Sequence, residues 1–92
     1  MILARVVGTV VATRKDPRLE GSKLLILKPV SPEGTPEAGY VIAVDTVGAG
    51  SNELVIAVSG SSARMADGCK EKPVDTAIIG IVDTVHLSGG QP

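Results

Sequence analysis

Residues 44–64 read VDTVGAGSNELVIAVSGSSAR and hold the pattern that decides the fold. A short apolar run, residues 53–59, lies between two turns that are rich in glycine and serine. Glycine permits a positive φ and a close approach of the backbone, which suits the tight turns on either side of a strand. Ser61 stands where its hydroxyl can cap a short helical turn. The stretch therefore predicts a turn, a strand, a second turn and a short helix.

The same stretch departs from two well-known functional motifs. Residues 48–50 begin like a dinucleotide-binding fingerprint, but Glu53 occupies the position of the third glycine and a strand-like run follows instead of a helix. Residues 60–64 begin like the nucleophile elbow of hydrolases, but Arg64 stands where that motif needs its second glycine. Neither a dinucleotide site nor a hydrolase is predicted.

The rest of the chain supplies further strand-like runs separated by loops. Charge, proline and glycine mark the loops, and the helical turn from Ser61 is the only helix expected. Five short strands without a long amphipathic helix predict an all-β domain that closes into a barrel. The whole chain, residues 1–92, is read as this one domain, and residues 88–92 are expected to fray. The expected strands are residues 2–13, 23–28, 40–46, 53–59 and 76–87.

The composition predicts a thin core. The chain has 92 residues, of which 43% are hydrophobic, and Tyr40 is its one aromatic residue. Valine, isoleucine, leucine and alanine bury less area per residue than large aromatic side chains. In residues 2–13 both faces carry apolar side chains, which suggests that the second face is buried against a neighbour. A domain of this size often gains stability by associating.

Charge and cysteine usage exclude several classes of protein. A formal charge of −1 and a nearly aromatic-free chain disfavour nucleic-acid binding. The single Cys69 excludes an internal disulfide framework and is expected to be a free thiol. Arg5 interrupts the apolar start, so that residues 1–13 read as a strand and not as a signal peptide or a membrane span.

Isolated polar residues offer weak candidates for chemistry. His86 is the sole histidine, whereas a metal site normally combines several ligands, so no metal site is predicted. Asp45, Asp75 and Asp83 have no partner histidine that would make an acid–base pair. Aspartate commonly organises local backbone hydrogen bonds, and roles in turns, caps or subunit contacts are expected for all three.

Five stretches in this order resemble the EutN/CcmL family of bacterial microcompartment vertex proteins. They are GTVVAT at 8–13, GSKLLIL at 21–27, VDTVGAG at 44–50, GSSAR at 60–64, and PVD at 73–75 leading into GIVD at 80–83. The resemblance implies an OB-like five-stranded β-barrel that assembles into a cyclic pentamer. It also implies a non-catalytic, cofactor-free subunit in the cytoplasm, which caps the vertices of a polyhedral shell beside hexameric shell proteins.

Within that family, two groups of residues are candidates for assembly roles. The first is a loop of small residues that would lie near the ring axis and line a narrow opening, where its amides could meet hydrated solutes; backbone geometry alone is the other interpretation. The second would contact other subunits or tiles, with the planar donor fork of Arg64 suited to a carboxylate or carbonyl; for residues 60–64 a purely internal role is the other interpretation. The loop residues are Gly48, Ala49, Gly50 and Ser51, and the contact residues are Arg14, Lys15, Arg18, Ser61, Ser62 and Arg64.

Two other functions stay open from the residues alone. An OB-like module could use its glycine loops to hold a small molecule or anion. An enzyme ranks behind it, because no nucleophile, base or metal constellation is visible in the sequence.

Overall fold

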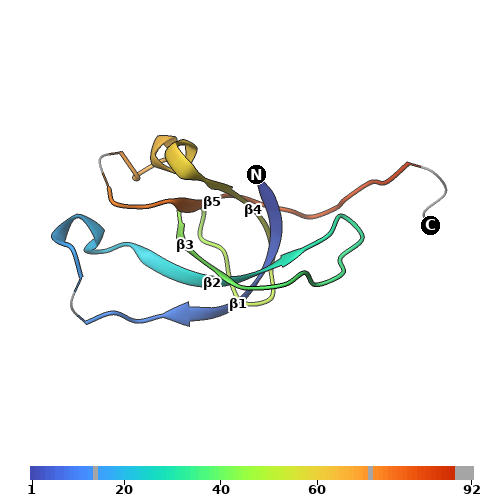
Figure 1. Cartoon of the computed structure of the whole chain (residues 1–92), viewed down its shortest axis with the longest axis horizontal. Helices are drawn as coiled ribbons and strands as arrows, with labels where there is room; N and C mark the ends of the chain where they lie inside the picture. Colours follow the sequence, from blue (N-terminus) through green and yellow to red (C-terminus); the bar gives the residue numbers. More distant parts are fainter. Residues whose placement is uncertain (14, 71, 89–92) are drawn as a thin grey trace.

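A computed structural model describes residues 1–13, 15–70 and 72–88 of the chain. The described residues form a small barrel, with loops that extend from both of its ends (Figure 1). Two 3-10 helices accompany the strands, and no α-helix is present in this part of the chain. The elements are β1 (Ile2–Val10), η1 (Pro17–Leu19), β2 (Lys23–Val30), β3 (Val41–Asp45), β4 (Leu54–Ser59), η2 (Gly60–Met65) and β5 (Thr76–Ile81).

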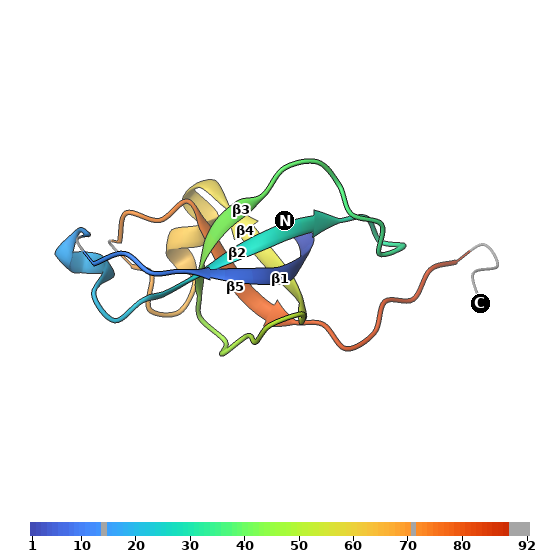
Figure 2. The same ribbon diagram turned by 90° about the horizontal axis from the view of Figure 1, so that it is seen from below.

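The strands close into a barrel in the order β1-β2-β3-β5-β4, and β4 pairs back onto β1. The expected all-β, five-stranded barrel is therefore confirmed. All neighbouring strands are antiparallel except β3 and β5, which run parallel and meet at only two positions, Val44 with Ala77 and Asp45 with Ile78. The view from below shows the strands crossing one another around the barrel (Figure 2).

The apolar core has two parts. The barrel interior is filled largely by alanine, valine and leucine, which fits the narrow space of a five-stranded barrel. A second cluster lies between the barrel wall and η2, and contains the fully buried Cys69 thiol. The first cluster comprises Ala4, Val6, Leu25, Leu27, Ala43, Ala49, Val55, Ala57 and Ile78, and the second Val44, Ala63, Cys69, Val74 and Ala77.

The first two strands differ in length from the prediction. β1 ends at Val10, because its last partner is Leu24 near the start of β2, and Val11 beyond it is 85% exposed. β2 continues through Pro29, which the sequence had assigned to a loop. The carbonyl of Pro29 accepts from Glu37, so its missing N–H faces away from β1 and costs no bond of that ladder.

The fifth strand also ends earlier than predicted. β5 stops at Ile81, and only the amide of Val82 still reaches Leu54. The next possible partner, Glu53, is already bonded to Val6 of β1, so the barrel has no ladder position left for residues 83–87. Residues 89–92, most of the expected frayed end, lie outside the described part of the chain.

The helix after β4 begins differently from the prediction. Ser59 is its N-cap residue, and no side chain caps it. The prediction that Ser61 caps this helix is wrong, because the positive φ of 68° at Gly60 already turns the chain and places Ser61 inside the first turn. The N-cap position lies before the first turn, and Ser59 holds it in place of Ser61.

Candidate functional site

The loop between β3 and β4, residues 46–53, is organised by the carboxylate of Asp45. Oδ1 accepts from the amides of Val47 at 3.0 Å and Gly48 at 3.1 Å, and Oδ2 accepts from the amide of Ala49 at 2.9 Å. These charge-assisted bonds fold the loop back onto the end of β3. The expected turn-forming role is confirmed for Asp45.

The far half of the loop is held to β1. The backbone of Val6 receives a bond from the Asn52 amide at 2.9 Å and donates to the Glu53 carbonyl at 3.0 Å, while Glu53 Oε1 accepts from the Gly50 amide. The Arg5 guanidinium donates to the Asn52 carbonyl at 2.6 Å. Asn52 itself has a φ of 67°, a left-handed conformation that asparagine tolerates better than most residues. The loop is therefore braced at both ends.

These hydrogen bonds determine which backbone amides of the loop are free to bind a ligand. The amides of Gly48, Ala49 and Gly50 all donate inside the loop, so the expectation that they meet a hydrated solute is wrong for these three. The Ala49 side chain is fully buried in the barrel core, whereas Gly48 and Ser51 are exposed. Of the four predicted loop residues, these two are the ones at the surface.

The charged loop after β1 folds onto itself. Arg18 donates from Nε and Nη2 to both carboxylate oxygens of Asp16, at 3.0 and 2.8 Å. The hydrogen bond from the Arg18 side chain, with a second from its amide, lowers the pKa of the Asp16 carboxyl to about 2. Lys15 donates to the carbonyl of Ala12 at 3.0 Å, and Arg14 lies outside the described residues. The described part of this loop, without residue 14, thus presents paired charges and no concentrated cationic patch.

The candidate contact residues on η2 are exposed. Ser61, Ser62 and Arg64 all lie at the surface, and Arg64 Nη1 makes one long bond, 3.3 Å, to the carbonyl of Val74. The rest of its donor fork makes no hydrogen bond to the residues that the structure describes. Leu19 of η1 packs against the cluster that contains Ala63 of η2, so the structure brings these two predicted contact regions to the same part of the molecule.

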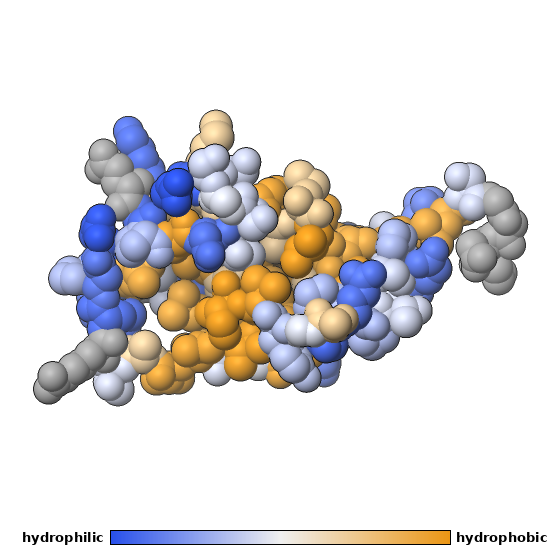
Figure 3. All heavy atoms as spheres, in the orientation of Figure 1, coloured by the Kyte–Doolittle hydropathy of each residue, from blue (hydrophilic) through white to orange (hydrophobic). Residues whose placement is uncertain are grey.

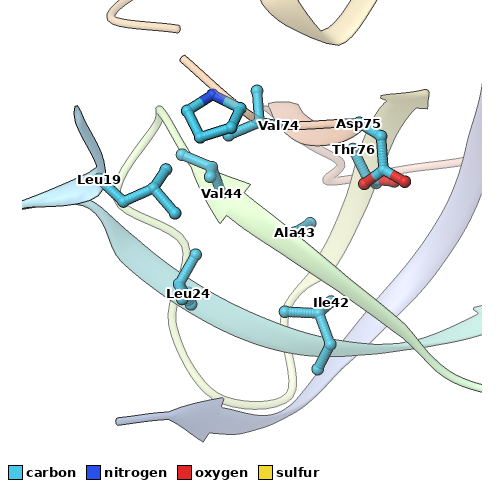
Figure 4. Close-up of a pocket in the computed structure, with 9 residues that line it drawn as sticks. Leu19, Leu24, Ile42, Ala43, Val44, Val74, Asp75 and Thr76 are labelled. Atoms are coloured by element: carbon cyan, nitrogen blue, oxygen red, sulfur yellow. The ribbon is translucent and has the colours of Figure 1, made fainter. Parts of the chain in front are cut away.

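A small hollow of about 210 Å³ opens beside this cluster, where β3 and the segment before β5 diverge. Leu19, Leu24 and Val44 point toward one another along one wall, and Asp75 and Thr76 lie apart from them on the other (Figure 4). Among the described residues, no cationic side chain lines the hollow, and the charged group that does is the Asp75 carboxylate. Such a lining does not suit an anion, so the alternative of an anion-binding module is not favoured.

The sequence did not single out an apolar groove of about 540 Å³ on the outside of the barrel. Val7, Ile26, Lys28, Pro36 and Tyr40 line it, and the Lys28 ammonium sits 4.3 Å from the centre of the Tyr40 ring. Figure 3 shows apolar side chains gathered over the middle of the barrel. Strand 23–28 already carried a signal for this surface, because it is apolar on both faces while a barrel wall needs only one.

Two kinds of feature are absent from the described residues, 1–13, 15–70 and 72–88. No group of histidine, cysteine, aspartate and glutamate side chains there is arranged to hold a metal ion. None of the helices in these ranges has the length and apolar character needed to cross a bilayer.

Comparison with known proteins decides the family. The model of the family described as ethanolamine utilisation protein EutN/carboxysome matches residues 1–83. The chain belongs to the EutN/CcmL family. It is 46% identical to the carboxysome shell vertex protein CcmL of Synechocystis sp., over 98% of this chain and 90% of that one. It is equally 46% identical to the bacterial microcompartment shell vertex protein EutN of Escherichia coli, over 99% and 95%.

The barrel of this EutN/CcmL chain also matches a solved assembly. It superposes on GrpN, a pentameric microcompartment shell protein from Rhodospirillum rubrum, with a TM-score of 0.87 and 44% identity. The match covers 95% of this chain and 99% of that one. Relatives from carboxysomes and from ethanolamine utilisation thus share one barrel with a pentameric shell protein.

Proposed function

We propose that this chain forms a pentamer that occupies the fivefold vertices of a bacterial microcompartment shell. The observation that carries the proposal is similarity along nearly the whole chain to vertex proteins of two kinds of compartment and to a pentameric shell protein. The role is structural and involves no catalysis or cofactor. The partners are copies of this chain and hexameric shell proteins, with neither nucleic acid nor membrane among them.

The geometry of a shell explains why such a subunit is needed. A layer of sixfold tiles is flat, and fivefold positions introduce the curvature that closes it. A head-to-tail interface between identical subunits gives a closed ring when the rotation per subunit divides the circle. A subunit whose interface rotates each copy by one fifth of a turn therefore forms a pentamer, and pentamers at the fivefold positions close the shell.

The exposed apolar strand residues support ring formation. Val7 is 47% exposed and Ile42 49% exposed on the β1-β2-β3 side of the barrel, and Ile79 and Ile81 of β5 are each 39% exposed. Clustered apolar surface on a small soluble domain commonly marks a subunit interface. A ring would bury these side chains, which the barrel interior leaves outside.

The polar candidates divide into an axis group and a lateral group. The loop around Gly48 and Ser51 is assigned to the ring axis, where exposed small residues let five copies approach one another. Lys15, Arg18 and the η2 residues are assigned to lateral contacts with neighbouring tiles. Both lateral elements lie away from the end of the barrel at which the chain leaves β5 (Figures 1 and 2).

Native mass spectrometry of the purified full chain at several subunit concentrations tests the ring. We expect a single assembly of five subunits that persists on dilution. A persistent monomer would contradict the proposal, and a stable hexamer would keep a shell role but remove the vertex assignment.

Replacing Arg64 by alanine tests the lateral contact. We expect a folded ring of five, because an exposed arginine contributes little to a core, with incorporation into shells reduced about tenfold by loss of the donor fork. The measurement is the ratio of vertex to hexameric protein in purified shells. Lys70→Ala, which removes another exposed cation, is the control. Wild-type incorporation of the Arg64 variant would remove the assignment.

A further inference from the structure

The segment that follows β5, residues 82–88, leaves the barrel in an extended form and is here named the trailing segment. Figures 1 and 2 both show it running away from the barrel. The Val82 amide still donates to the Leu54 carbonyl at 2.8 Å. Beyond it, no hydrogen bond joins residues 83–88 to any other described residue. The backbone of residues 83–88 is thus unpaired within the described part of the subunit.

The side chains of the trailing segment nevertheless follow the pattern of a half-buried strand. Val85 and Leu87 fall on one face with Asp83, and Thr84, His86 and Ser88 fall on the other. Alternation with a period of two is the signature of a strand that has one apolar and one wet face. The sequence predicted a strand through residue 87, and the barrel has no ladder position for its last part.

The apolar groove described above has the chemistry that this apolar face requires. Its floor and walls come from Val7, Ile26, Pro36 and Tyr40, and Lys28 places a cation at the same site. Val7 is 47% exposed, because it follows the buried Val6 and successive side chains of a strand point to opposite faces. The cation complements Asp83, which shares the apolar face of the trailing segment.

We propose that the trailing segment of one subunit lies in the apolar groove of the next subunit, with Val85 and Leu87 inserted and Asp83 directed to Lys28. This inference rests on the proposed ring. A head-to-tail ring presents two different surfaces at each interface, and here an extended segment supplies one and a groove the other. The partner is a second copy of this chain.

Two pairs of substitutions in the same segment test which face is buried. Val85→Asp with Leu87→Asp places charges on the apolar face, whereas Thr84→Asp with His86→Asp places them on the polar face. We expect the first pair to raise the subunit concentration for half-assembly at least about tenfold and the second to leave it unchanged. Native mass spectrometry gives both values. Equal assembly by the two variants would overturn the proposal.

Engineered cysteines locate the partner surface. Full-length chains that carry Val85→Cys with Val7→Cys, or Val85→Cys with Tyr40→Cys, are expected to give a ladder of linked chains on oxidation, because a disulfide needs closely spaced Cα atoms. Val85→Cys with Val11→Cys is the control, since Val11 is exposed just beyond the end of β1 and does not line the groove.

The outcomes separate this inference from the proposed function. A ring of five subunits in which neither groove pair links would overturn the docking and leave the vertex role intact. A fast-migrating monomer with an internal disulfide would show that the segment folds back onto its own groove, which also overturns it. Absence of any ring in the wild-type chain would contradict the proposed function itself.

Discussion

Replacing Asp45 by alanine is expected to lower the free energy of unfolding by about 3 kcal/mol, because one carboxylate holds three backbone amides. Without it, the amides of Val47, Gly48 and Ala49 lose their partners together. Water can satisfy the exposed ones, but Ala49 lies against the barrel core, where an unpaired N–H costs more. The loop should therefore open from its β3 end.

Denaturant unfolding at a fixed subunit concentration measures this change, since assembly itself adds to apparent stability. Asp45→Asn keeps one acceptor oxygen but directs an amide group at a donor, so an intermediate loss of about 1.5 kcal/mol is expected. Asp67→Ala is the matched control, because Asp67 is exposed and accepts no hydrogen bond within the described residues. If the Asp45 and Asp67 variants were equally stable, the bracing role would be refuted.

The strands illustrate what local pattern can and cannot predict. Apolar runs bounded by charge, proline and glycine located all five strands, because these residue types mark the loops between them. Their ends depend on partners that are distant in sequence. Pro29 stays in β2 because its nitrogen faces away from β1. β5 stops because the Glu53 carbonyl already accepts a hydrogen bond from the Val6 amide. Neither fact is visible in the residues beside the strand end.

In the candidate loop, residues 46–53, local sequence again predicted some features, whereas others depend on distant parts of the chain. Its glycines and Asp45 were correctly read as the parts of a tight turn, since these residue types act through local backbone geometry. The burial of Ala49 was not foreseen, because the direction of one methyl group depends on how the braced loop meets the barrel. The groove around Val7 likewise combines residues of β1 and β2 with Pro36 and Tyr40 of the following loop, and no single stretch of sequence shows that they meet.

Ala49→Phe is expected to lower the free energy of unfolding by about 3 kcal/mol, through overpacking of the barrel core. The Ala49 side chain has no exposed surface and belongs to the main core cluster. A phenyl ring has to displace neighbouring side chains or pull the loop away from the bonds that Asp45 and Glu53 make to it. If the Ala49→Phe chain no longer formed a pentamer, the cause would therefore be impaired folding and not a blocked opening at the axis.

Ser51→Phe separates the two roles, because Ser51 is exposed in the same loop. Its stability is expected to stay within about 0.5 kcal/mol of the wild-type value, as is usual for surface positions. Five phenyl rings at an axis would nevertheless obstruct the opening, so solute passage or ring assembly should change without any loss of folding. An Ala49→Phe chain as stable as Ser51→Phe would contradict the burial of Ala49. If assembly and solute passage were both unchanged in Ser51→Phe, the Ser51 side chain would not face the ring axis. The assignment of this loop to the axis would then be wrong.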